Sequence, residues 1–349
     1  MCILANYRII YLIIILKRVI NTVTQEHSKP HGRERKGIFK MTRDARFGIE
    51  IEMTGITREK AAKAIAEYFN GEIRYVGGTY YAYEVTDCQD RVWKVMRDSS
   101  IRPQKKMGGR TVSASDEYRV EFVTPILGYD DIEELQEIVR KLRSAGAFTN
   151  ASNQGMHVHV SMDGMTAQAL RNLVNLLASK EDLLYDAIQV NEGRIGYCKK
   201  TNQRFLKQLN EKKPKTLEEL ADVWYNGDAE YSRTRKYHDS RYVLCNLHAF
   251  FLRQAIEFRC WNATLHAGEV KAAIQFCIAM VHQAVTTKKA IYRRTTTDNP
   301  KYTFRCWMLR LGLIGDEFKT CRYHLLKHLE GNAAWKEAPS RFGTSTPTA

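Results

Sequence analysis

Three short segments of the chain alternate polar and apolar residues, and each is expected to be a β-strand with one buried and one polar face. They are residues 47–52 (FGIEIE), 155–162 (GMHVHVSM) and 256–265 (IEFRCWNATL). Side chains two apart on a strand point to the same side of the sheet. The polar pairs are Glu50 with Glu52, His157 with His159, and Glu257 with Arg259. The positions between them are apolar, so we expect the opposite faces to form core and the polar faces to line a cavity.

A solvated strand face would explain any one of these pairs taken alone. The combination is more specific, because carboxylates and imidazoles bind divalent cations and a fixed guanidinium neutralises phosphoryl charge. Together the three segments predict a cavity that holds magnesium or manganese and a polyphosphate. A metallohydrolase built on His157 and His159 is an alternative, although zinc sites favour more nitrogen and sulfur ligands than these segments offer.

A fourth strand is expected over residues 118–127, broken by Pro125. Glu121 lies among apolar neighbours there, so its carboxylate needs either solvent or a cation. Residues 72–98 alternate and turn, which indicates a hairpin or meander. Asp98 stands at the end of that region and could face the cavity, but we favour a turn-initiating role because that is the commoner case for an aspartate there.

Helices are expected between the strands, and a further strand is expected over residues 242–250 (YVLCNLHAF). The helical segments are 57–69, 131–143, 166–179, 268–290 and parts of 301–335. The polar, basic stretch 191–240 is either a solvated linker or a flap over the cavity, and we favour the flap. Alternating strands interspersed with helices predict an α+β fold with an antiparallel sheet. No GxxxxGK[ST] or GxGxxG motif follows a strand, which argues against P-loop and Rossmann sites.

Composition limits the class of protein. A chain of 349 residues with 44% hydrophobic residues can bury a large core. Its eight cysteines form no CxxC pair, which predicts reduced thiols and a cytoplasmic location. The net charge of +15 raises the possibility of a nucleic-acid partner. No helix-turn-helix, zinc-finger or RNP pattern is visible, so we expect the basic body to serve an anionic substrate such as ATP.

The first forty residues differ from the rest. They hold eight Lys/Arg against two Glu, and an apolar run over residues 9–16 that is too short to span a bilayer. No stable membrane association is therefore expected. Residues 32–37 (GRERKG) are of types that purine-rich codons encode, as upstream of a start codon, so Met41 is the hypothesised start. We predict that 1–40 is a mis-annotated extension or a disordered segment, 41–290 a catalytic domain, and 291–349 a helical region and tail packed on that domain.

The strand motifs resemble the carboxylate-amine ligases of the glutamine synthetase superfamily, and most closely the amidoligase branch found in bacteria and phages. The resemblance is carried by FGIEIE, EFVTPIL, QGMHVHVSM, RYVLCNL and IEFRCWNATL, and it covers residues 47–290. It implies a curved antiparallel sheet with helices on its outer face, and a funnel that binds ATP with Mg²⁺ or Mn²⁺. The implied metal ligands are Glu50, Glu52, Glu121, His157 and Glu257.

The resemblance also implies roles for three other residues. His159 would lie closer to the nucleotide phosphates, Arg259 would contact the transferring phosphoryl group, and Arg241 would hold a phosphate or the carboxylate substrate. The chain departs from glutamine synthetase itself, because no N-terminal grasp domain is recognisable and no second acidic residue follows Glu121 in clear register. Asp130 or Asp131 is the nearest substitute.

The implied activity is ATP-dependent amide formation through an acyl phosphate, with amino acids, peptides or protein side chains as substrates. A phosphotransferase of the guanidino-kinase type on the same architecture is one alternative. A basic nucleic-acid-binding protein without catalysis is another, and it predicts salt-sensitive binding that does not depend on Glu50 or Glu257.

Overall fold

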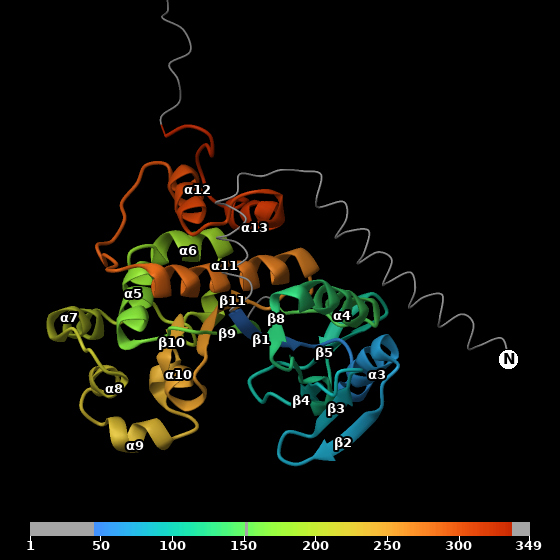
Figure 1. The fold of residues 1–349 in the computed structure, drawn as a ribbon. Helices are drawn as coiled ribbons and strands as arrows, with labels where there is room; N and C mark the ends of the chain where they lie inside the picture. The colour runs from blue at the N-terminus through green and yellow to red at the C-terminus, as the bar shows by residue number, and fades with distance from the viewer. Residues whose placement is uncertain (1–44, 151–152, 337–349) are drawn as a thin grey trace, which may run out of the picture. The chain divides into compact units, whose positions relative to one another are not determined.

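The computed structural model describes residues 45–150 and 153–336, and one large antiparallel sheet forms its centre (Figure 1). Across the sheet the strands run β10 (Cys245–Asn246), β11 (Ile256–Asn262), β9 (Gly155–Met162), β1 (Ala45–Met53), β7 (Val120–Val123), β4 (Val92–Met96), β3 (Ala82–Thr86) and β2 (Ile73–Gly77). The short strand β8 (Leu127–Gly128) also pairs with β1, and β5 (Gln104–Met107) and β6 (Arg110–Ser113) form a separate hairpin. The predicted α+β class with a large antiparallel sheet is confirmed.

The alternation in the strands separates a core face from a polar face. In β1, Phe47, Ile49 and Ile51 are almost fully buried, at 2%, 1% and 0% exposure. Val158 and Val160 of β9 are buried on the same side, because Ile49 pairs with Val158 and Phe47 with Val160. The residues between them, including both glutamates and both histidines, therefore share the other face of the sheet.

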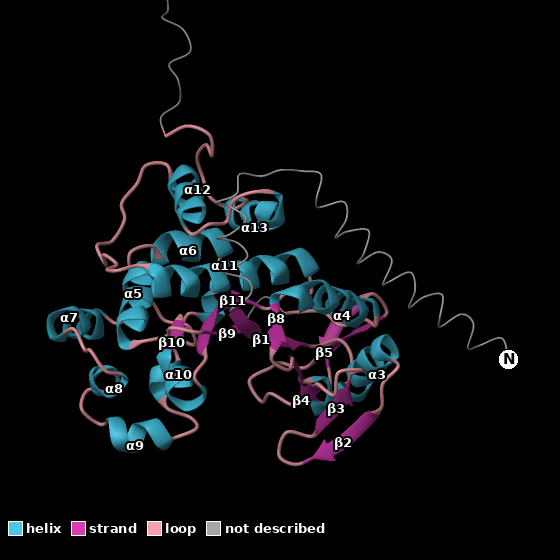
Figure 2. Cartoon of the chain, in the orientation of Figure 1, coloured by secondary structure: helices cyan, strands magenta, loops and turns pink. Residues whose placement is uncertain are grey.

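Four helices form a layer over the apolar face. They are α3 (Arg58–Phe69), α4 (Ile132–Ser144), α11 (Ala267–Thr286) and α5 (Ala167–Ala178). The first lies on β3 and β4, and α11 lies on β9 and β1. An outer group consists of α6 (Glu181–Ile188), α12 (Pro300–Arg310) and α13 (Lys319–Leu326), which contact one another (Figure 2). Of these, α13 packs on α11, and α12 reaches it through aromatic rings. Because α11 lies between the sheet and this outer group, it is buried on nearly all sides.

The remaining helices are short and connect β9 to β11. They are α7 (Gln203–Lys212), α8 (Leu217–Trp224), α9 (Ala229–Thr234) and α10 (Leu247–Arg253). The single-turn 3₁₀ helices are η2 (Asp116–Tyr118), η3 (Tyr129–Asp131), η4 (Glu192–Arg194), η5 (Asp239–Arg241) and η6 (Asp316–Phe318). Residues 191–240 thus contain three α-helices and two single-turn 3₁₀ helices.

The cap residues explain where the predicted helices begin and where one prediction is wrong. Thr57 and Thr166, the first residues of two predicted helical segments, cap α3 and α5 by accepting hydrogen bonds from Lys60 N and Ala169 N. The strand predicted over 242–250 is limited to two residues. Asn246 accepts a hydrogen bond from Ala249 N and caps α10. The strand therefore ends at Asn246 and a helix follows it.

Two expectations about the N-terminus, the apolar run at 9–16 and the start at Met41, lie outside the described residues. Within the described residues, we find no helix that is both long enough and apolar enough to cross a bilayer.

Candidate functional site

The register of four adjacent strands places the polar pairs in one row. Glu50 of β1 pairs with His157 of β9, and Glu257 of β11 pairs with His159 of β9. On the other side of β1, Glu52 pairs with Glu121 of β7. Side chains directly opposite each other have Cβ atoms about 4.5–5.5 Å apart. The three predicted pairs and Glu121 therefore form one continuous polar surface across β11, β9, β1 and β7.

One half of this surface combines histidines with carboxylates. Ligand atoms of Glu50, His159 and Glu257 all lie within 4.8 Å of one another, and we call them the histidine–carboxylate group. His159 Nε2 is 3.2 Å from Glu50 Oε1, yet it is buried and lacks a well-aligned hydrogen bond within the described part of the chain. His157 Nδ1 lies 3.0 Å from Glu50 Oε2 and 3.5 Å from Glu257 Oε1. His157 thus supports both carboxylates, and His159 completes the group.

The other half contains carboxylates alone. Ligand atoms of Glu52, Asp98 and Glu121 also lie within 4.8 Å of one another, and we call them the carboxylate group. Glu52 Oε2 accepts a hydrogen bond from Gly155 N at 2.9 Å. Asp98 Oδ1 accepts one from Ser100 N at 2.6 Å, so this residue initiates a turn, as expected, and also faces the site.

The two halves differ in electrostatics. Burial, together with the charge of Asp98, raises the pKa of Glu52 to about 7. Burial, followed by the charges of Glu50, Asp98 and Glu52, raises the pKa of Glu121 well above its usual value. These shifts mean that the carboxylate group has more negative charge than the surrounding protein neutralises. A divalent cation bound by oxygen ligands would supply the missing charge.

In the histidine–carboxylate group, positive and negative charges are closer to balance. Burial alone would raise the pKa values of Glu50 and Glu257, but neighbouring cationic groups lower both. For Glu50 these are His159 and His157, and for Glu257 the largest is Arg259. Burial, then the charge of Arg259, lowers the pKa of His157. Burial would lower the pKa of His159, but the neighbouring carboxylates, above all Glu50, outweigh it and raise that pKa. A metal ion bound to His159 would therefore displace a proton from the imidazole.

Arg259 lies at the rim of this surface, on a strand with a bulge. The register of β11 against β9 shifts between Phe258 and Trp261. Arg259 Nη1 donates to Glu257 Oε1, and its backbone carbonyl accepts a 2.8 Å bond from Arg194 Nη2. Arg194 is 1% exposed and also donates to Trp261 O. Arg194 thus binds the backbone at both ends of the bulge, and the bulge directs the Arg259 side chain toward the site.

Gly155 makes this arrangement possible. A Cβ built on Gly155 would lie 2.2 Å from Arg194 Nη2 and 2.6 Å from its Cζ. Only a glycine allows the guanidinium to cross the start of β9, while the amide of the same residue donates to Glu52.

Arg241, the other predicted arginine, lies further from the carboxylates than Arg259 does. Its guanidinium carbon is 4.8 Å from the ring centroids of both Tyr237 and Tyr242. The Tyr242 ring in turn lies 6.0 Å from the guanidinium carbon of Arg259. Tyr237 and its neighbour Lys236 reach the hydroxyl group of Tyr80, which follows β2. The predicted flap therefore contacts the opposite end of the sheet.

Sequence reasoning identified most of the polar surface but did not assign three contributors to it. Asp98 supplies the third carboxylate that was sought at Asp130 or Asp131; Asp131 instead binds Arg91 at 3.0 Å and Gly128 N. Asn246 Nδ2 donates to Glu257 Oε2. Arg194 is the third, and no local pattern marks it, because its partners are about 65 residues away in the sequence.

A pocket of about 610 Å³ continues from the histidine side of the surface. Ser161 and Arg46, which pair with each other across β9 and β1, lie on the same face as His159 and Glu50. Both line the pocket, as do Arg233, Arg253 and Phe250. Asp163 and Glu218 line it too, so the three arginines leave the pocket with mixed charges and a small positive excess.

Comparison with known proteins agrees with the strand motifs. The family described as "putative amidoligase enzyme" matches residues 43–281, which include every strand of the sheet and every predicted site residue. No curated protein matches the chain. The family match covers well over half of the sequence, and the resemblance inferred from the motifs is confirmed. The chain belongs to the amidoligase family and is an enzyme of the ligase type.

Proposed function

We propose that the chain is an ATP-dependent carboxylate-amine ligase on a sheet of the glutamine synthetase catalytic type. The observation that carries the proposal is the pair of adjacent groups of potential cation ligands on one sheet face. Glu50 belongs to one group and Glu52 to the other, so β1 spaces the two sites. Oxygen and imidazole ligands in this number suit Mg²⁺ or Mn²⁺.

The residues present fit such cations by their chemistry. The raised pKa values of Glu52 and Glu121 indicate uncompensated negative charge. His159 Nε2 is buried without a well-aligned hydrogen bond among the residues described. Glu52, Asp98 and Glu121 would hold one ion, and Glu50, Glu257 and His159 the other, with His157 supporting the two glutamates. Bound ions would neutralise the phosphates of ATP during phosphoryl transfer.

The protein's own groups would then position two substrates. Arg259, with a side chain 12% exposed, would contact the transferring phosphoryl group, and Arg241 would hold a phosphate or the substrate carboxylate. In the first step the carboxylate attacks the γ-phosphorus and releases ADP, leaving an acyl phosphate. In the second an amine displaces inorganic phosphate, loses a proton and forms the amide. Positioning and charge neutralisation are the main contributions expected of the residues here.

The acceptor is proposed to be an amino acid, a peptide or a protein side chain. In the 610 Å³ pocket three arginines outnumber the acidic Asp163 and Glu218, which favours an anionic group on one of the ligands. A phosphotransferase would use the same cations and ATP but yield a phosphorylated product. The product therefore decides between the two.

The experiment is turnover of ATP with Mg²⁺ or Mn²⁺ and a pool of amino acids and short peptides, followed by mass spectrometry. We expect a product lighter than its two precursors by one water, formed together with ADP and phosphate. Glu257→Ala should abolish it, whereas Glu59→Ala, at an exposed glutamate on α3, should not. A phosphorylated acceptor instead of an amide would replace the ligase assignment with a kinase.

A further inference from the structure

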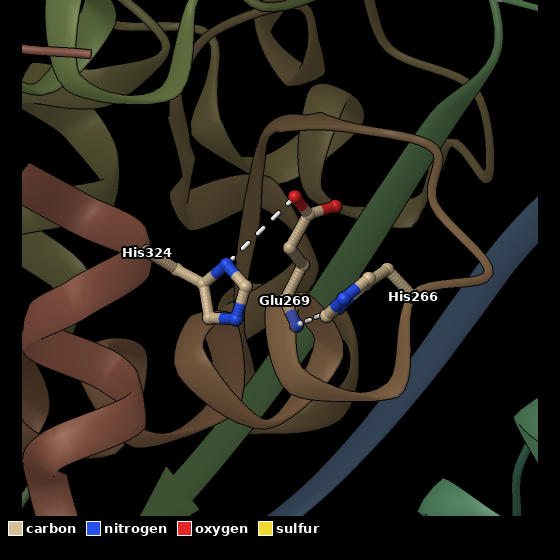
Figure 3. A group of neighbouring side chains, drawn as sticks. All are labelled: His266, Glu269 and His324. Carbon is tan, nitrogen blue, oxygen red and sulfur yellow. Dashed lines mark hydrogen bonds and ion pairs between the residues drawn. The ribbon is translucent and has the colours of Figure 1, made fainter. Parts of the chain in front are cut away.

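A second cluster of histidine and carboxylate side chains lies on the helix-covered side of the sheet, where α11 begins and α13 packs against it (Figure 3). His266 is the N-cap of α11, Glu269 is in its first turn, and His324 is on α13. Ligand atoms of all three lie within 4.8 Å of one another. None of them belongs to the polar surface described above.

Helix capping explains the positions of His266 and Glu269, but it does not explain why His324 lies beside them. Its side chain is 10% exposed, and its Nδ1 lies 3.8 Å from Glu269 Oε1. That nitrogen is buried and has no hydrogen-bond partner within residues 45–150 and 153–336. Leaving a buried polar atom unpaired is unfavourable. A cation between this nitrogen and the carboxylate would give the nitrogen a partner.

The two imidazoles converge over Gly268. A Cβ at this position would lie 2.8 Å from His324 Nε2 and 3.3 Å from His266 Nδ1. The absence of a side chain leaves room in which both rings approach the carboxylate. His266 Nδ1 accepts only a long bond, 3.3 Å, from Glu269 N, so a cation would compete with a weak interaction.

Glu269 is already oriented toward the histidines. Thr264 Oγ1 donates to its Oε2 at 2.7 Å, which fixes the carboxylate and directs Oε1 toward His324. Such supporting hydrogen bonds are usual around metal ligands. Lys327 Nζ lies 2.6 Å from the same Oε1. Its flexible, partly exposed ammonium neutralises the carboxylate and would have to withdraw when a metal ion binds.

We propose that His266, Glu269 and His324 form a binding site for a divalent transition-metal ion of the Zn²⁺ type. Two imidazoles and one carboxylate are a donor set that favours Zn²⁺ over Mg²⁺. Ligand atoms of a tetrahedral zinc site lie roughly 3.3 Å apart, given Zn–N bonds of about 2.0–2.1 Å. The observed 3.8 Å between His324 Nδ1 and Glu269 Oε1 needs only a small contraction.

The site would fasten α13 to the helix that follows β11. Only residues 263–265 separate that strand, which carries Glu257 and Arg259, from the N-cap of α11. His324 lies beyond residue 281, where the family match ends. The metal ion would therefore join the C-terminal helices to the sheet-bearing part of the chain, whether or not the proposed ligase activity is correct.

The test is titration of the full chain with Co²⁺, whose visible spectrum reports tetrahedral coordination, in excess Mg²⁺ to occupy the carboxylate sites. We expect His324→Gln to weaken Co²⁺ binding by about 100-fold, since even supporting residues contribute roughly 10–100-fold to metal affinity. His328→Gln, an exposed histidine on the turn after α13, is the matched control and should bind as the wild type does. Lys327→Met should bind more tightly, because it removes the competing ammonium.

Thermal unfolding gives a second readout. Zn²⁺ should raise the melting temperature of the wild type and of His328→Gln but not of His324→Gln. If His324→Gln fails to fold, Gly268→Ala takes its place, with Gly196→Ala as control because a Cβ there meets nothing within 4 Å. Equal Co²⁺ affinity in each variant and its control, or no Co²⁺ binding by the wild type in excess Mg²⁺, would overturn the proposal.

Discussion

Glu52 and Glu121 lie directly opposite each other on adjacent strands, with Asp98 beside them. Like charges in this position repel, and burial removes the water that would screen them. The group has two ways to relieve the repulsion: it can hold protons, or it can bind a cation. Its behaviour should therefore depend on both pH and divalent metal.

The pH dependence has a definite sign. Burial and Asp98 raise the pKa of Glu52 to about 7 in the metal-free fold, whereas an unfolded glutamate titrates near 4.3. The folded state thus binds more protons between these values, and stability is lost as pH rises through about 7. We expect Glu52→Gln to gain up to about 3 kcal/mol of unfolding free energy over the wild type between pH 5 and 8.

Urea unfolding without metal, at several pH values, measures this difference. Glu59→Gln, whose carboxylate is exposed, should follow the wild type. Added Mg²⁺ should stabilise the wild type at pH 8 far more than Glu52→Gln. Parallel pH profiles for wild type and Glu52→Gln would refute the assigned charge excess.

Arg259 gives a second prediction at the residue scale. If it contacts the transferring phosphoryl group, Arg259→Ala should lower kcat by roughly 10³- to 10⁵-fold, as arginines in phosphoryl transfer do. Arg294, whose side chain is 72% exposed, is a matched surface arginine, and Arg294→Ala should change kcat little. Steady-state kinetics on variants with wild-type circular dichroism spectra make the comparison. A loss of less than tenfold in Arg259→Ala would place the residue outside the reacting centre.

At the scale of elements, one side chain couples a helix to the site. Asn246 caps α10 and also donates to Glu257, whereas Asn202 caps α7 and touches no site residue. Losing either cap should cost about 1 kcal/mol of stability. Only Asn246→Ala should also weaken Mn²⁺ binding, because it releases the carboxylate of Glu257. Calorimetric titration of both variants checks this, and equal Mn²⁺ affinities would show that the cap acts on the fold alone.

The bulge of β11 depends on a close approach between elements. A Cβ at Gly155 would clash with Arg194, so Gly155→Ala should cost about 1–3 kcal/mol of stability and displace Arg259. Gly196→Ala, with open space around its Cβ, should be nearly neutral. Thermal unfolding and kcat are the measurements, and the interpretation fails if Gly155→Ala keeps wild-type values of both.

At the scale of the whole molecule, the sequence predicts features that follow from a local repeat of residues. It does not predict features that depend on contacts between distant parts of the chain. Strand alternation placed Glu50, Glu52, His157 and His159 on one face because a period of two is a property of the backbone. Residues 247–250 were read as part of a strand, since an apolar run does not reveal that the Asn246 side chain caps a helix there. Arg194 became visible only when folding brought it beside β11, and Asp98, assigned to a turn, proved to lie beside Glu52 and Glu121 as well.

The most direct test of the central claim is a count of the cations on the sheet. Mn²⁺ added to the protein with a non-hydrolysable ATP analogue can be followed by electron paramagnetic resonance. The two neighbouring ligand groups predict two Mn²⁺ ions per chain with coupled spins. Glu121→Gln and Glu257→Gln should each leave a single uncoupled ion. One ion or none in the wild type, or coupled spectra that both variants preserve, would contradict a two-cation nucleotide site.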